Sequence, residues 1–184
     1  MAEQKAKPKI EDTISKYLDG EMKASALEFV AYLYDSKMKP TWSASDVWRS
    51  TYKNVSICRT FVYEGKSNHQ WIKEADTFPS WCVGLYLKHI DKYGEVLINE
   101  GIQDFIWDNV CYCNLCRVRG RTPCHDRPPG RNITLLSKKV KSICNIVPVY
   151  GIIWVYNPGE KEKTYIKRLI ELEQKAIIEN KTVK

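Results

Sequence analysis

The sequence predicts an α+β fold with a mainly antiparallel sheet, helices packed on one face, and a cysteine-rich basic loop. Segments with the alternation of β-strands cluster in the first half of the chain and recur near its end. Strands and helices do not alternate regularly, which argues against a parallel sheet built from βαβ units. The 184 residues are 43% hydrophobic, enough for the core of one domain.

The N-terminal part, residues 1–24, is predicted to form an arm with a short helix, followed by a single domain over residues 25–184. The first residues are charged and lack the apolar contacts that would order them. The short helix is expected to begin at Asp12 and to end at Gly20, a residue that favours helix ends.

The second helix is predicted to begin at Ser25, because Ser25 and Glu28 have the spacing of a capping box. The apolar residues that follow at helical spacing are Leu27, Val30, Ala31, Tyr34 and Met38. Pro40 ends this helix, since proline lacks the backbone N–H that a helix needs.

The β region is predicted to open with a hairpin of strands Val47–Tyr52 and Val55–Tyr63. Both are rich in β-branched and aromatic residues, and Lys53-Asn54 between them has the length of a tight turn. Further strands are expected at His69–Lys73, Ser80–Ile90, Asn132–Ser137, Lys141–Asn145 and Pro148–Tyr156. The turn between the strands at 132–137 and 141–145 is placed at Lys138 and Lys139.

Two more helices are predicted. The helix Tyr93–Asn109 is expected to pack its face of Ile98, Ile102, Phe105 and Ile106 into the core. The last helix begins at about Glu160 and is expected to pack on the sheet. Its repeating face consists of Tyr165, Ile166, Leu169, Ile170, Glu173 and Ile177.

The segment from Cys111 to Cys144 differs from the rest of the chain. It contains five of the seven cysteines, and eight basic residues against one acid give it a charge of +7, equal to the net charge of the whole chain. The arginines at 117, 119 and 121 alternate, and Arg127 and Arg131 follow. Guanidinium groups bind phosphate or carboxylate in a fork, so these five are candidate anion ligands. A solvated loop that keeps the protein soluble is the other interpretation.

A structural zinc site is predicted in this segment. Cys113 and Cys116 are spaced so that one turn presents both thiolates to a metal, and Cys124 and Cys144 are the expected remaining ligands of a closed tetrahedral site. Cys111 and His125 are the alternates. Buried free thiols are a second interpretation, and redox chemistry at Cys113 and Cys116 is a third.

Tryptophans on or beside the predicted strands are candidate lining residues of a ligand pocket. These are Trp42, Trp48, Trp71 and Trp81. An aromatic sheet face forms a cleft in some small α+β binding proteins, and aromatic side chains also serve as plain core residues.

The chain resembles an uncharacterised family of small bacterial proteins, mainly from clostridia, with W…W…YK…C, CxxC, PG and GK…C blocks. The matching residues are Trp42, Trp48, Tyr52, Lys53, Cys58, Cys113, Cys116, Pro129, Gly130, Lys138 and Cys144. Ser137 stands where the pattern has Gly, and the segment Arg117–Arg127 is longer than in the pattern. The resemblance implies no activity, because none is known for the family.

The expected function is that of a small cytoplasmic binding protein for a small ligand or another protein, with zinc in its basic loop. A membrane helix needs about 18 consecutive apolar residues, and no apolar run in the sequence approaches that length, so a membrane partner is not expected. A nucleic-acid-binding accessory protein and a thiol redox enzyme are the alternatives. An enzyme is the less favoured interpretation, because the sequence lacks the motifs HExxH and GxSxG and a glycine-rich phosphate loop.

Overall fold

The computed structural model describes residues 7–44, 46–63, 80–110, 131–136, 138–143 and 153–182. Its main sheet consists of β1 (Thr41–Ala44), β2 (Val47–Tyr52), β3 (Val55–Val62), β4 (Trp81–Leu85) and β7 (Ile153–Tyr156). The spatial order is β1-β2-β3-β4-β7, and each neighbouring pair is antiparallel. The predicted α+β class is therefore confirmed.

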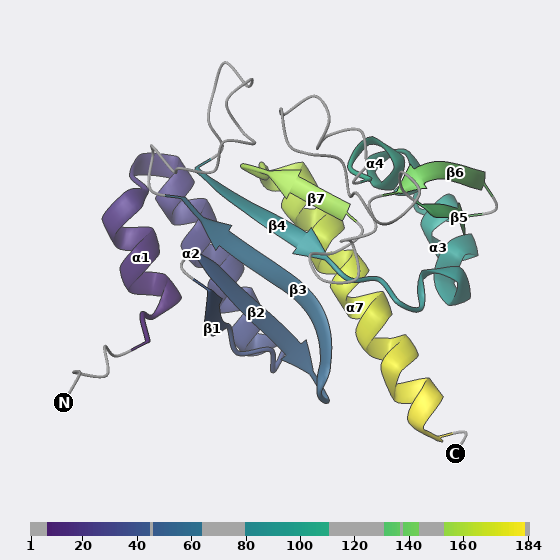
Figure 1. Cartoon of the computed structure of the whole chain (residues 1–184), viewed down its shortest axis with the longest axis horizontal. Helices are drawn as coiled ribbons and strands as arrows, with labels where there is room; N and C mark the ends of the chain where they lie inside the picture. Colours follow the sequence, from purple (N-terminus) through teal and green to yellow (C-terminus); the bar gives the residue numbers. More distant parts are fainter. Residues whose placement is uncertain are drawn as a thin grey trace.

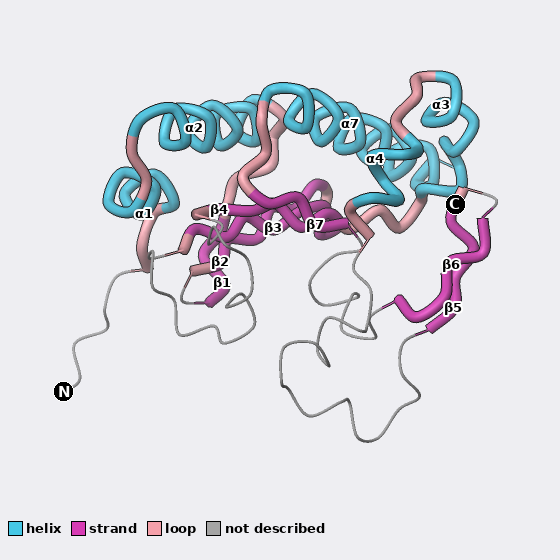
Figure 2. Tube along the Cα trace, turned by 90° about the horizontal axis from the view of Figure 1, so that it is seen from above, coloured by secondary structure: helices cyan, strands magenta, loops and turns pink. Residues whose placement is uncertain are grey.

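The longest helices cover one face of this sheet. They are α2 (Gly20–Asp35) and α7 (Glu160–Thr182), with the shorter α1 (Ile10–Tyr17) beside α2. Figure 1 looks onto the strands with α2 and α7 behind them, and Figure 2 shows the helices as one layer above the strands. The prediction of helices on one face is confirmed.

The core lies between these layers. Trp81 of β4 is 1% exposed, and its ring centroid lies 6.0 Å from that of Phe29 in α2. Ile10 and Ile14 of α1 belong to the same cluster, at 1% and 0% exposure. Among the described residues, no helix has both the length and the hydropathy that crossing a membrane requires.

The predicted β2–β3 hairpin is confirmed. Lys53 and Asn54 form its turn with φ values of +47° and +68°, the left-handed pair that a tight two-residue hairpin needs. The ladder is regular from Tyr52↔Val55 to Thr51↔Ser56 and resumes at Ser50↔Cys58. Ile57 is thus an extra residue on β3, a β-bulge.

The start of α2 differs from the prediction. The helix begins at Gly20, so Ser25 lies inside it and the predicted capping box is wrong. Ser25 Oγ donates instead to the carbonyl of Pro158 over 3.4 Å, and Glu28 pairs with Lys163 and Lys167 of α7. Both polar side chains join α2 to α7, a contact that the local pattern does not reveal.

The predicted helix Tyr93–Asn109 is wrong as a single element. The chain forms a 3-10 turn η2 (Ile90–Tyr93), then α3 (Gly94–Asn99) and α4 (Gln103–Asp108). Gly101, at φ +68°, adopts the left-handed conformation that ends α3 and turns the chain. Ile98 is consequently 43% exposed, whereas Ile102 and Ile106 are buried as predicted.

A second, two-stranded sheet consists of β5 (Arg131–Leu135) and β6 (Lys138–Ile143). Lys138 and Lys139 begin β6 and do not form the predicted turn, which falls earlier, near Leu136 at φ +50°. Leu135, Leu136 and Val140 pack into the core, and Lys138 Nζ lies 4.3 Å from the ring centroid of Trp107. These contacts fasten the hairpin to α4.

The chain leaves and re-enters the main sheet at neighbouring points. Val110 forms an isolated antiparallel bridge with Ile153, and Trp154 N–H donates to the carbonyl of Asn109 over 2.9 Å. Of the strand predicted at 148–156, residues 153–156 are confirmed as β7. Residues 148–152, and the strand predicted at 69–73, lie outside the described residues.

Candidate functional site

Two arginines lie side by side on the sheet face that points away from α2 and α7. Arg49 of β2 and Arg59 of β3 are directly opposite each other in the ladder. Their neighbours Trp48 and Thr60 are buried toward the helices, so alternation places both arginines on the other face. Like charges directly opposite each other in a sheet repel, and two guanidinium groups close together are suited to bind an anion.

The β-bulge creates this pair. An unbroken ladder from the turn would pair Tyr52 with Val55 and, three positions on, Arg49 with Cys58. Arg49 and Arg59 would then point to opposite faces, because a one-residue change of register exchanges the faces. The extra Ile57 moves Arg49 opposite Arg59. The bulge therefore places two guanidinium groups on one face, a common role of bulges beside functional sites.

Tyr86 and Lys88, just beyond β4, extend the same surface. The backbone N–H of Tyr86 donates to the carbonyl of Ile57 over 2.7 Å, and the guanidinium carbon of Arg59 lies 5.8 Å from the Tyr86 ring centroid. The face of an aromatic ring attracts a guanidinium cation, so Tyr86 helps to hold Arg59 in place. Lys88 is exposed. We call Arg49, Arg59, Tyr86 and Lys88 the basic face.

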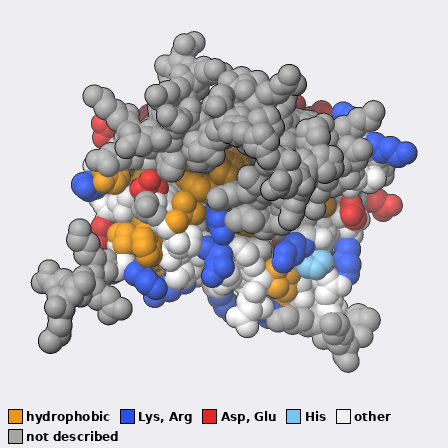
Figure 3. All heavy atoms as spheres, in the orientation of Figure 1, with side chains coloured by type: hydrophobic (Ala, Val, Ile, Leu, Met, Phe, Trp, Pro, Cys, Tyr) orange, Lys and Arg blue, Asp and Glu red, His pale blue; other side chains and the backbone are white. Residues whose placement is uncertain are grey.

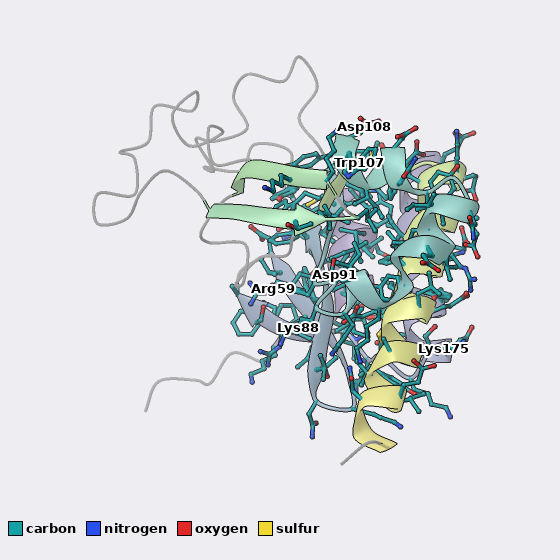
Figure 4. The ribbon with its side chains drawn as sticks, turned by 90° about the vertical axis from the view of Figure 1, so that its right-hand side faces the viewer. Arg59, Lys88, Asp91, Trp107, Asp108 and Lys175 are labelled. Carbon is teal, nitrogen blue, oxygen red and sulfur yellow. The ribbon has the colours of Figure 1, made fainter. Side chains whose placement is uncertain are left out.

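The figures agree with this grouping. In Figure 4, Arg59 and Lys88 extend on the side of the sheet opposite α7, whereas Lys175 projects from α7 on the helix side. In Figure 3, lysine and arginine side chains predominate over the lower part of the visible face, where exposed hydrophobic side chains lie between them. The lower part of this face therefore gathers positive side chains, which attract polyanions.

Aromatic side chains occupy the adjoining part of the same sheet face. Phe61 and Trp154 pack with ring centroids 4.9 Å apart, and both are buried, as is Tyr63. Tyr156 is 40% exposed beside Trp154, with 6.3 Å between the ring centroids. Of these four, Tyr156 alone presents a largely accessible ring, and the others have a packing role.

A buried carboxylate joins α7 to the segment that carries Lys88. Glu173 is 0% exposed, and its oxygens accept hydrogen bonds from the backbone N–H groups of Lys88 and His89 over 3.1 and 3.2 Å. His89 Nδ1 lies 2.8 Å from Oε1, and the Tyr93 hydroxyl donates to Oε2 over 2.7 Å. Four partners compensate the cost of burying this charge.

This arrangement fixes His89. Nδ1 faces the buried carboxylate, and the His89 side chain as a whole is 24% exposed, so Nε2 is the ring nitrogen that Glu173 does not contact. Burial, with the nearby Glu173 charge, raises the pKa of Tyr93 well above its ordinary value, so this phenol stays a hydrogen-bond donor. Among the described residues, no group of three or more His, Cys, Asp or Glu is arranged to hold a metal.

A second charged residue lies on the buried face of α7. Lys163 is 1% exposed and pairs with Glu28 of α2, and its Nζ lies 2.7 Å from an Oε1 of Glu160. Burial lowers the pKa of Lys163, but its hydrogen bonds to Glu160 and Glu28 outweigh this effect and the pKa is raised. The position of Lys163 between two helices assigns it a structural role.

The predicted metal ligands lie outside the described residues, namely Cys113, Cys116, Cys124, Cys144, Cys111 and His125. The candidate anion ligands Arg117, Arg119, Arg121 and Arg127 lie outside as well, and of Arg131 only the backbone, at the start of β5, is described. Within the hairpin, Arg131 is opposite Ile143.

Three of the four predicted pocket tryptophans have packing positions. Trp48 and Trp81 are each 1% exposed and face the helices, and Trp42 is half-buried against the same core. Trp48 Nε1 donates to the carbonyl of Pro8 over 3.2 Å. Trp71 lies outside the described residues. Core packing accounts for the positions of Trp42, Trp48 and Trp81.

The described cysteines have no reactive thiol. Cys58 and Cys82 are both 0% exposed. Burial raises the pKa of each thiol to about 12, although the nearby hydroxyls of Ser50 and Tyr63 lower it in part. A thiol with so high a pKa holds almost no thiolate at neutral pH, and the thiolate is the nucleophile. Thiol redox chemistry at these two positions is therefore not supported.

The sequence contained a signal for Glu173, because this glutamate occupies a position of the apolar repeat of the last helix. It contained little signal for Arg49 and Arg59 as a pair, because the bulge decides their face. Comparisons of the chain with family models, curated proteins and solved structures find no match. The resemblance to the clostridial family therefore stays a prediction.

Proposed function

We propose that this protein binds nucleic acid and holds the phosphate backbone against the basic face. The opposed pair Arg49 and Arg59 carries the proposal. The two guanidinium groups lie at directly opposed positions on one sheet face, and a phosphate can accept charge-assisted hydrogen bonds from both. The net charge of +7 favours the same class of partner.

The basic segment 111–144 fits this function as a second contact region. Its arginines at 117, 119, 121, 127 and 131 are proposed to bind further phosphates. Zinc at Cys113, Cys116, Cys124 and Cys144 is proposed to order the segment, because a loop with little apolar content gains its folding energy from the metal.

The test is fluorescence anisotropy with a labelled single-stranded oligonucleotide at several salt concentrations. We expect Arg49→Ala with Arg59→Ala to weaken binding and to reduce the slope of log affinity against log salt by about 0.7 for each lost phosphate contact. Lys175→Ala removes one exposed lysine on the helix side and should leave affinity and slope unchanged.

Two outcomes contradict the proposal. One is a parent protein that does not bind the oligonucleotide at low salt. The other is an affinity that falls equally in the arginine variant and in Lys175→Ala, which would show a non-specific charge effect. A labelled duplex of the same sequence, measured in parallel, distinguishes a single-strand binder from a general polyanion binder.

The metal has its own test. Elemental analysis of the purified protein should find one zinc per chain, and a chelator should increase proteolysis within residues 111–144 without unfolding the core. A metal-free protein, cleaved equally with and without chelator, would refute the zinc site. A protein that holds zinc but binds no nucleic acid would instead support the binding of a small ligand or a protein partner.

A further inference from the structure

We propose that His89 is an additional phosphate-binding residue at the edge of the basic face, and that it binds only in its protonated form. This inference rests on the proposed nucleic-acid binding and adds to it a dependence on pH. It begins from Glu173, whose contacts determine which ring nitrogen of His89 carries a proton.

The first step concerns the proton on Nδ1. The Glu173 carboxylate accepts hydrogen bonds from two backbone N–H groups, which can only donate, and from the Tyr93 hydroxyl. Oε1 accepts from the Lys88 N–H and Oε2 from the His89 N–H and the Tyr93 hydroxyl, so both carboxylate oxygens act as acceptors in this network. Nδ1 of His89, 2.8 Å from Oε1, is therefore the donor.

The second step concerns Nε2. In a neutral ring with its proton on Nδ1, Nε2 bears a lone pair, which repels a phosphate oxygen. In the protonated ring, both nitrogens donate, so Nε2 forms a charged hydrogen bond to an anion while Nδ1 keeps its bond to Glu173. The carboxylate thus makes His89 a phosphate ligand that depends on its second proton.

The third step concerns the surrounding charges. Glu173 of α7 faces Nδ1, with the neutral phenol of Tyr93 on the same carboxylate. Lys88 precedes His89, Asp91 follows in η2, and both are exposed. Arg59 of β3 lies on the same side of the sheet as Lys88, as Figure 4 shows, while Lys175 of α7 lies on the other side. Lys88, which precedes His89 in the chain, belongs to the basic face, so the proposed phosphate chain would contact Lys88 and His89 together.

A purely structural role for His89 makes a different prediction. If the ring only fastens the segment to α7, its replacement changes stability, and the dependence of binding on pH stays as it was. His89→Asn separates the two roles, because the Asn amide can donate to Glu173 as Nδ1 does and takes up no proton. Equal urea midpoints for parent and variant at pH 8 would show that the bond to Glu173 is retained.

The experiment measures the affinity for the labelled single-stranded oligonucleotide at pH 5.5 and at pH 8, at constant ionic strength. The parent should bind about tenfold more tightly at the lower pH, the effect of one charged hydrogen bond. His89→Asn should bind equally at both pH values. If the parent shows no such dependence, or if the variant retains it, the inference is wrong and the proposed function stands. If the parent binds at neither pH, the proposed function itself fails.

A second measurement keeps the inference testable if the variant does not fold. Nuclear magnetic resonance of the assigned His89 ring in the unmodified protein follows its titration with and without the oligonucleotide. Because coupling between two ligands is reciprocal, the oligonucleotide should move the titration midpoint of this ring to higher pH. An unchanged midpoint in the presence of bound oligonucleotide overturns the inference.

Discussion

Replacement of Glu173 by alanine should destabilise the protein more than any exposed substitution. The change removes the acceptor of four hydrogen bonds at a side chain that is 0% exposed. The Tyr93 hydroxyl is buried and would lose its acceptor, which costs about 1–3 kcal/mol. The backbone N–H groups of Lys88 and His89 and the His89 ring are partly accessible to water, so the loss of their acceptor adds less to the free-energy cost. The total is about 3–5 kcal/mol, the usual cost of removing one partner from a buried charged pair.

Urea unfolding followed by tryptophan fluorescence measures this loss. With a slope of about 2 kcal/mol per molar urea, the midpoint should fall by about 2 M. Glu173→Gln keeps the shape but turns an amide N–H₂ toward groups that are themselves donors, so it should give an intermediate loss. Glu171→Ala is the control on the same helix, where an exposed carboxylate pairs with Arg168 over 3.4 Å and contributes about 0.5 kcal/mol or less.

A loss below about 1 kcal/mol in Glu173→Ala would refute this reasoning. It would show that water replaces the carboxylate and that the segment carrying Lys88 and His89 does not depend on α7. The proposed protonation of His89 would then also lose its basis, because the carboxylate fixes which nitrogen carries the first proton.

Three further predictions concern other parts of the fold. Cys58 and Cys82 should not react with a thiol reagent in the native protein at pH 8, because burial raises the pKa of each thiol to about 12. They should react after unfolding, which peptide mass analysis would show. Modification of either cysteine in the folded protein would contradict its burial. Gly101→Ala should lower the free energy of unfolding in urea by about 1 kcal/mol, because φ at this position is +68°. No atom of the described residues lies within 4 Å of the new Cβ, so the cost comes from the backbone conformation alone. An unchanged urea midpoint would mean that the backbone relaxes. Hydrogen bonds from Lys163 and Lys167 lower the pKa of Glu28 below its ordinary 4.5. The contribution of Glu28 to the free energy of unfolding is therefore present above pH 4.5 and is lost as the pH falls through the lower pKa of the folded state. Glu28→Gln should lose less stability on acidification than the parent, and parallel curves of stability against pH would argue against this linkage.

The hairpin β2–β3 and the helix α7 could be predicted from the sequence, because their signals are local. Alternating side chains flank Lys53-Asn54, and apolar residues recur at helical spacing after Glu160. The capping box at Ser25 was a false signal for the same reason. Ser25 and Glu28 have the local spacing of a cap, while their actual partners lie on α7.

The candidate site depends on contacts that no local pattern contains. The bulge at Ile57 decides that Arg49 and Arg59 share a face, and a shift of one residue leaves no trace in the alternation of a short strand. Glu173 could be recognised as a charge within an apolar stripe, but its partners Lys88, His89 and Tyr93 come from a distant segment. The break at Gly101 was missed because isolated glycines also occur inside helices.

The bridge between Val110 and Ile153 has a consequence for how this chain can vary. The excursion between them starts and finishes at adjacent points of one scaffold. Closing a loop between fixed ends becomes only about 0.6 kcal/mol more costly for each doubling of its length. Insertions or deletions between Val110 and Arg131 therefore leave the register of β7, and everything α7 packs against, in place. The length of this segment can therefore change during evolution while the main sheet and the helices α2 and α7 keep their arrangement.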